Sequence, residues 1–218
     1  MIFDLDGVLV DSEAAWDQAR RRVVARHGGH WAPDATRAMM GMSSPEWAAY
    51  LRDELGVDAS VAVIVAEVVA LLEAQYVERL PLLPGAVDAV RMLAGRWSLG
   101  LASSSNRPII EHFLDASGLR PCFAVTVSSE EVAHGKPAPD VYVEAARRLG
   151  VAPKVCVAVE DSTNGIRSAA TAGMRVIAVP NAEFPPAADA VAQAAAVVTT
   201  VRDVTVELVE AVSRPQDA

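Results

Sequence analysis

Short apolar runs alternate with helix-length segments through the second half of this chain, and this alternation is the strongest constraint on its fold. The predicted strands are 98–102, 123–127, 155–159, 175–179 and a shorter one near 196–199. The predicted helices are 86–95, 107–117, 141–149, 164–172 and 203–212. Strands that alternate with helices of this length predict an α/β fold, a parallel sheet with helices on both faces.

A purely helical block separates this alternating region from a first strand at residues 1–3. Its predicted helices are 13–26, with Ser12 as N-cap, and then 33–40, 45–55 and 60–79. Two prolines and a glycine, Pro81, Pro84 and Gly85, end the block. We therefore expect a Rossmann-like core built from residues 1–11 and 84–218, with residues 12–83 inserted as a helical cap.

Charge and hydropathy exclude several classes of partner. The net charge of −9 argues against nucleic acid, although a local cation would still permit a phosphorylated metabolite as the small-molecule partner. The most apolar stretch, 61–72, contains Glu67 and is too short to span a bilayer, so we expect a buried helix and no membrane partner. No secretory leader pattern opens the sequence, so we expect a cytoplasmic protein. As a separate expectation, the protein is either a monomer or a homodimer.

Two acidic residues follow the first strand directly. Asp4 and Asp6 are two positions apart, so they would face the same side of an extended segment. Carboxylates this close repel each other unless a cation or a shared proton holds them. The pattern is compatible with a metal site, an acid/base pair or an ordinary acidic turn.

Polar residues also follow the later strands, and a parallel sheet would bring them to one edge. They are Ser103, Ser104 and Asn106, then Lys136, then Glu160 and Asp161. Hydroxyls and free backbone N–H groups at a helix start suit an anion. Several carboxylates beside one lysine suit Mg²⁺ shared with a substrate phosphate.

These segments carry a specific resemblance. Residues 4–9 (DLDGVL), 101–104 (LASS), 135–137 (GKP) and 159–162 (VEDS) resemble, in this order, the four motifs of the haloacid dehalogenase-like hydrolase superfamily. The similarity is greatest to the branch that contains phosphoglycolate phosphatase, sugar phosphatases and β-phosphoglucomutase. It extends over nearly the whole chain, including a helical cap after the first motif.

The resemblance implies catalytic roles. Asp4 would attack phosphorus and form an aspartyl-phosphate. Asp6 would protonate the leaving oxygen and later deprotonate the attacking water. Ser103 and Lys136 would hold the phosphoryl oxygens. Dehalogenases of this superfamily lack the second aspartate, so the resemblance argues against carbon–halogen hydrolysis.

The resemblance also implies a cofactor and a substrate site. Mg²⁺ would be bound by the Asp4 carboxylate, the Asp6 main-chain carbonyl and Asp161, with Glu160 as a ligand or close by. The implied substrate-binding residues are Ser103, Ser104, Asn106 and Lys136 from the core, with Trp16 and Ser44 from the cap.

Cap residues decide between hydrolysis and phosphoryl transfer within this branch. Ser44, Trp16 and Glu78 stand where the mutase pattern has a basic residue, a histidine and a lysine. These differences remove cations that would hold a second phosphate, so we expect a Mg²⁺-dependent phosphatase acting on a sugar phosphate or a phosphoglycolate-like ester. The alternatives are a β-phosphoglucomutase-like phosphomutase and a non-catalytic binding protein on the same fold.

Other prominent residues receive structural interpretations. Trp31, Trp47 and Trp97 are expected to pack in the interior. The three successive arginines at 20–22 are expected to form a solvated face of a cap helix. The four histidines show no metal-ligand spacing.

Overall fold

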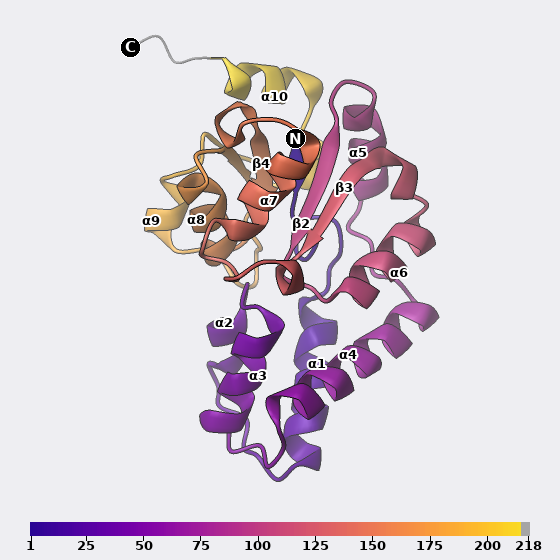
Figure 1. The fold of residues 1–218 in the computed structure, drawn as a ribbon, viewed down its shortest axis with the longest axis vertical. Coiled ribbons are helices and arrows are strands. Elements are labelled where there is room, and N and C mark those ends of the chain that lie inside the picture. The colour runs from indigo at the N-terminus through magenta and orange to yellow at the C-terminus, as the bar shows by residue number, and fades with distance from the viewer. Residues whose placement is uncertain (215–218) are drawn as a thin grey trace.

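A computed structural model describes residues 1–214, and the strands of these residues form one six-stranded parallel sheet (Figure 1). The strands are β1 (Ile2–Phe3), β2 (Leu99–Ser103), β3 (Phe123–Ser128), β4 (Val157–Glu160), β5 (Arg175–Ala178) and β6 (Ala196–Val197). Their order across the sheet is β3-β2-β1-β4-β5-β6, so the short first strand lies between β2 and β4. The sequence-based prediction of an α/β fold with a Rossmann-like parallel sheet is confirmed.

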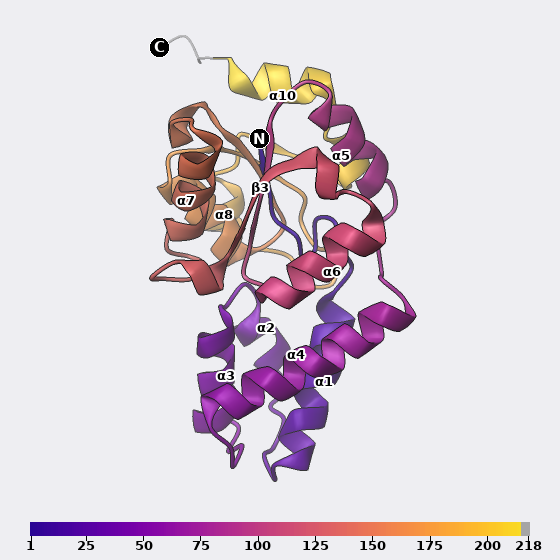
Figure 2. The same ribbon diagram turned by 45° about the vertical axis from the view of Figure 1, so that its right-hand side comes forward.

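Helices cover both faces of the sheet (Figure 2). Successive strand residues point to opposite faces, and both faces carry apolar side chains that must be buried. Phe3 belongs to a buried cluster on the face covered by α5 (Ala86–Ala94), α6 (Arg107–Ser117) and α10 (Val206–Ser213). Ile2 belongs to a second cluster beneath α7 (Asp140–Leu149), α8 (Thr163–Thr171) and α9 (Ala188–Val191). Because both faces of the sheet are covered, the strand sequences are almost continuously apolar.

The helical block lies beyond the carboxyl ends of the strands (Figures 1 and 2). Its helices are α1 (Glu13–Arg26), α2 (Ala35–Met39), α3 (Ser44–Asp53) and α4 (Val61–Glu78). The predicted apolar segment 61–72 forms most of α4, and Ile64, Val68 and Leu72 are fully buried. Each contributes about 1.5–3 kcal/mol of burial free energy, which explains the hydrophobicity of this helix. No helix among residues 1–214 has both the length and the hydropathy to cross a membrane.

Two antiparallel linkers connect the block to the sheet. Val10 forms an isolated antiparallel bridge with Leu82, and the Asp11 N–H donates to the Pro81 carbonyl at 2.8 Å. The Leu83 N–H donates to the Leu9 carbonyl at 3.0 Å. The chain thus leaves and re-enters the sheet region at one place.

Several element ends differ from the sequence-based expectation. β4 begins at Val157 and not at Val155, because Pro153–Val155 form a 3-10 turn. α10 begins at Val206, since Thr205 caps it by accepting a hydrogen bond from the Leu208 N–H. Ser12 occupies the predicted N-cap position of α1, but its side chain makes no capping hydrogen bond.

Candidate active site

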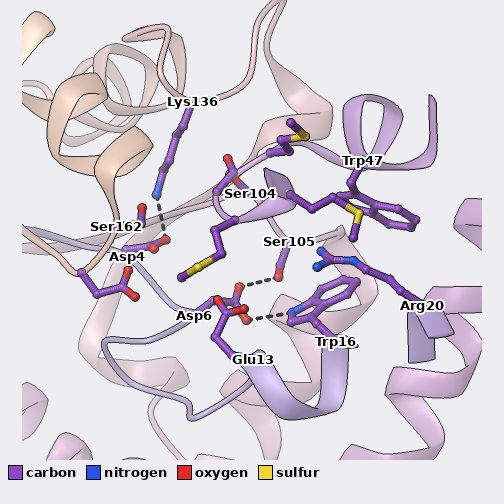
Figure 3. Close-up of a pocket in the computed structure, with 15 residues that line it drawn as sticks. Asp4, Asp6, Glu13, Trp16, Arg20, Trp47, Ser104, Ser105, Lys136 and Ser162 are labelled. Atoms are coloured by element: carbon purple, nitrogen blue, oxygen red, sulfur yellow. Dashed lines mark hydrogen bonds and ion pairs between the residues drawn. The ribbon is translucent and has the colours of Figure 1, made fainter. Parts of the chain in front are cut away.

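The segments that follow β1, β2, β3 and β4 meet beyond the carboxyl ends of these strands and line a pocket of about 490 Å³, including the space open to solvent (Figure 3). Its walls combine core residues with side chains from the helical block. The lining residues are Asp4, Asp6, Glu13, Trp16, Arg20, Met39, Met40, Gly41, Met42, Trp47, Ser104, Ser105, Lys136, Asp161 and Ser162.

Three buried carboxylates lie close together at this site. Oxygens of Asp4, Glu160 and Asp161 lie within 4.8 Å of one another. Gly7 permits this approach: its φ is +74°, and a Cβ there would lie 2.0 Å from Asp161 Oδ2. Burial raises the pKa of Asp4 and of Asp161, and the neighbouring Glu160 charge raises both further.

Lys136 is the cation of this cluster. Its Nζ lies 2.8 Å from Asp4 Oδ1 and 2.6 Å from Glu160 Oε1, and only 1% of its side chain is exposed. Burial alone would lower the lysine pKa, but the charges of Asp4 and Glu160 outweigh burial and raise it. The ammonium is therefore held charged in the interior.

Both carboxylate oxygens of Glu160 accept hydrogen bonds from other groups of the protein. Oε1 accepts hydrogen bonds from Lys136 Nζ at 2.6 Å and from the Tyr142 hydroxyl at 2.8 Å. Oε2 accepts from the Asp161 N–H at 3.0 Å and from the Ser162 N–H and hydroxyl at 3.3 Å. Within residues 1–214, the carboxylates of Asp4 and Asp161 accept no hydrogen bond beyond the Lys136 contact of Asp4, so they are the acids available to a ligand.

The charge balance of this cluster fits a divalent cation. With all three carboxylates ionised, the cluster would hold three negative charges against one ammonium, and both desolvation and mutual repulsion disfavour that state unless a further cation is bound. Carboxylate oxygens are also the ligands that Mg²⁺ prefers. The residues present thus suit the predicted metal.

Asp6 is held from two directions. Its Oδ1 accepts a hydrogen bond from Trp16 Nε1 at 3.1 Å, and its Oδ2 accepts one from the Ser105 hydroxyl at 2.6 Å (Figure 3). The Ser103 hydroxyl is 3.5 Å from Oδ2 and accepts from the Ser105 N–H at 2.9 Å. Trp16 belongs to α1, so a side chain of the helical block orients an acid of the core.

Two predicted substrate-binding residues instead join the helical block to the core. The buried Ser44 hydroxyl donates to Asn106 Oδ1 at 2.6 Å, and Asn106 Nδ2 donates to Glu130 Oε1 at 2.6 Å. Ser44 and Asn106 therefore do not line the pocket. Ser104 does, and its hydroxyl donates to the Gly41 carbonyl at 3.0 Å.

The expectation of a solvated arginine face is wrong for Arg20. This side chain is buried between Trp16 and Trp47, with its guanidinium carbon 4.9 Å and 5.1 Å from their ring centroids. Trp47 packs as expected but also lines the pocket. The arginine becomes buried because it extends between two aromatic faces, one from α1 and one from α3, that only the tertiary structure brings together.

Sequence reasoning also missed Glu13. This residue lines the pocket, and burial raises its pKa to about 7, with Arg20 acting in the opposite direction. Glu13, Trp16 and Arg20 are three and four positions apart, so they share one face of α1. That spacing was the signal available in the sequence.

The comparisons with known proteins agree with the geometry. A family profile described as haloacid dehalogenase-like hydrolase matches residues 1–173. Hexitol phosphatase B of Escherichia coli is 37% identical over 191 residues, covering 84% of this chain and 83% of that protein. Fructose-1-phosphate phosphatase YqaB of the same organism is 35% identical over 184 residues, covering 82% and 95%.

A solved structure is also similar over nearly the full length. The crystal structure of CbbY from Rhodobacter sphaeroides in complex with phosphate superposes with a TM-score of 0.82 at 28% identity, covering 96% of this chain and 97% of that one. The chain therefore belongs to the haloacid dehalogenase-like hydrolase family, as its four motifs predicted.

Proposed function

We propose that this chain is a Mg²⁺-dependent phosphatase that hydrolyses a small phosphorylated metabolite through an aspartyl-phosphate on Asp4. The observation that carries the proposal is the buried Asp4 carboxylate beside Lys136 and Asp161, in a pocket that side chains of the helical block help to line. Family membership makes the chain a hydrolase, and the names of its phosphatase relatives support the phosphoric monoester class.

The proposed chemistry has two displacements at phosphorus. An Asp4 oxygen forms a bond to phosphorus while the bond to the ester oxygen breaks, and Asp6 donates its proton to that leaving oxygen. Asp6 then accepts a proton from the water that attacks phosphorus and releases phosphate. Trp16 and Ser105 hold the Asp6 carboxyl in the orientation that both transfers need.

Electrostatics explains the other roles. Bound between Asp4, the Asp6 carbonyl and Asp161, Mg²⁺ would neutralise phosphoryl charge and reduce repulsion of the nucleophile. Lys136 contributes a second fixed positive charge. We assign Glu160 to positioning Lys136, because its oxygens are already occupied by protein donors.

We further propose that residues 12–83 act as the cap over this site. The paired linkers at Val10 and Leu82 support a common hinge, and the Ser44–Asn106 and Ser104–Gly41 hydrogen bonds support closure against the core. Closure would exclude bulk water from the phosphoryl group.

Phosphate release from a panel of esters, with Mg²⁺ or with EDTA, tests this function. We expect Mg²⁺-dependent release by the native sequence and none by the Asp4→Asn variant. Release that is indifferent to EDTA, or that persists in Asp4→Asn, contradicts the mechanism. Transfer of the phosphoryl group back to product without net release would indicate a phosphomutase instead.

A further inference from the structure

Arg20 is a buried cation that lacks an ionic partner. Only 6% of the residue is exposed, and within residues 1–214 no carboxylate oxygen lies within 4.0 Å of its guanidinium nitrogens. Its Nε is buried and has no hydrogen-bond partner. A buried charge without partners is costly, so a group that enters the pocket is its natural counterpart.

The position of Arg20 is fixed and faces the pocket. Figure 3 shows its guanidinium between the indoles of Trp16 and Trp47, directed toward the pocket interior. The two rings are 6.0 Å apart between centroids. Contact with both aromatic faces stabilises the cation and restricts its rotamers, so its N–H groups are preorganised for a ligand.

Glu13 supplies acceptors on the same wall. It lies about two turns before Arg20 on α1 and lines the same pocket. Among residues 1–214, its carboxyl oxygens have no hydrogen-bond donor. The wall therefore offers unused donors from Arg20 and unused acceptors from Glu13.

The surrounding charges identify the kind of group that fits. Arg20 lies in the field of three acids, Glu13, Asp6 and Asp17. A second phosphate or a carboxylate of the substrate would gain one cation but meet these negative charges. A hydroxyl group avoids this repulsion, since it can accept from Arg20 and donate to Glu13.

We propose that Arg20 and Glu13 are specificity-determining residues that contact neighbouring hydroxyls on the leaving group, so that the preferred substrate is the monophosphate of an uncharged polyol. This inference rests on the proposed phosphatase function and adds the chemical class of the leaving group and two residues that recognise it. The indole faces of Trp16 and Trp47 complete this wall beside the hydroxyl-binding groups.

Substrate selectivity tests the proposal. We would measure kcat/KM for glucitol 6-phosphate, which carries hydroxyls, and for phenyl phosphate, which carries none, in the native sequence and in Arg20→Met and Glu13→Gln. The ratio of the two values should fall about tenfold or more in each variant, chiefly through KM for the polyol ester. Arg22→Met is the matched control, because Arg22 is exposed on the same helix, and it should leave the ratio unchanged.

A binding measurement separates recognition from turnover. In an Asp4→Asn background, glucitol 6-phosphate should quench or shift tryptophan fluorescence, since Trp16 and Trp47 flank Arg20, and adding Glu13→Gln should weaken that binding about tenfold. Glu13→Gln also provides the test if Arg20→Met does not fold.

The outcomes are distinguishable. If the native sequence hydrolyses esters but the ratio is unchanged in both variants, the specificity assignment is wrong and the phosphatase function stands. A native preference for a sugar bisphosphate or for phosphoglycolate over glucitol 6-phosphate also overturns it, because Arg20 would then bind a second anion. If the native sequence releases phosphate from no ester, the proposed function fails, and this inference with it.

Discussion

Replacing Lys136 with methionine should destabilise the protein more than any exposed substitution. Methionine keeps a chain of similar length but removes the ammonium, leaving Asp4, Glu160 and Asp161 buried without a protein cation. Removing one partner of a buried ion pair costs about 3–5 kcal/mol, because the remaining charge stays desolvated. With a urea m-value of about 3 kcal/mol/M, the unfolding midpoint should fall by roughly 1–1.7 M.

Urea unfolding in EDTA at pH 7.5, followed by circular dichroism, measures this loss. Lys154→Met is the matched control, since Lys154 is the other lysine of the chain and is exposed. It should change the free energy of unfolding by less than about 0.5 kcal/mol.

The pH dependence of the deficit provides the sharpest check. Burial raises the pKa of Asp4 and of Asp161 above their unfolded values, so acidification protonates these carboxyls in the native state first. The difference between native sequence and Lys136→Met should therefore shrink as the pH falls from 7.5 toward 5. A deficit below about 1 kcal/mol at pH 7.5, or one that grows on acidification, would refute the account of Lys136 as counterion to the buried acids.

Three further predictions concern the acids. Asp4→Asn should abolish turnover and yet raise the melting temperature of the EDTA-treated protein at pH 8, because the amide removes a desolvated charge; a lower melting temperature would contradict this. Asp161→Asn should weaken Mg²⁺ binding about tenfold or more in isothermal titration calorimetry, and unchanged affinity would exclude Asp161 as a ligand. Burial raises the pKa of Glu13 from 4.5 to about 7, so the free energy of unfolding of the native sequence falls as the pH rises through this interval. Glu13→Gln should therefore be more stable than the native sequence by up to about 3 kcal/mol at pH 8, and no more stable below pH 4. A Glu13→Gln gain that is independent of pH in urea titrations would show that burial of the charge is not its cause.

Much of the core site could be predicted because it depends on topology. Once the strands are known to be parallel, the residues after each strand must share one edge, and Asp4, Lys136 and Asp161 do converge there. Their chemical types then indicate metal and phosphate binding. The roles of Ser44 and Asn106 could not be predicted this way, since their mutual hydrogen bond depends on how the helical block sits against the core.

The sequence by itself determined the α/β class, the helical insertion and the convergence of polar groups at the strand ends, because hydrophobic periodicity and strand direction are local properties that propagate through a regular sheet. Only the tertiary structure decided that Arg20 is buried while its neighbours Arg21 and Arg22 are exposed. It also decided that both carboxylate oxygens of Glu160 accept hydrogen bonds from protein donors. Those outcomes depend on which surfaces α1 and α3 bring together and on the room that Gly165 leaves for the Glu160 carboxylate. Packing across long sequence separations sets such details, and no local pattern encodes them.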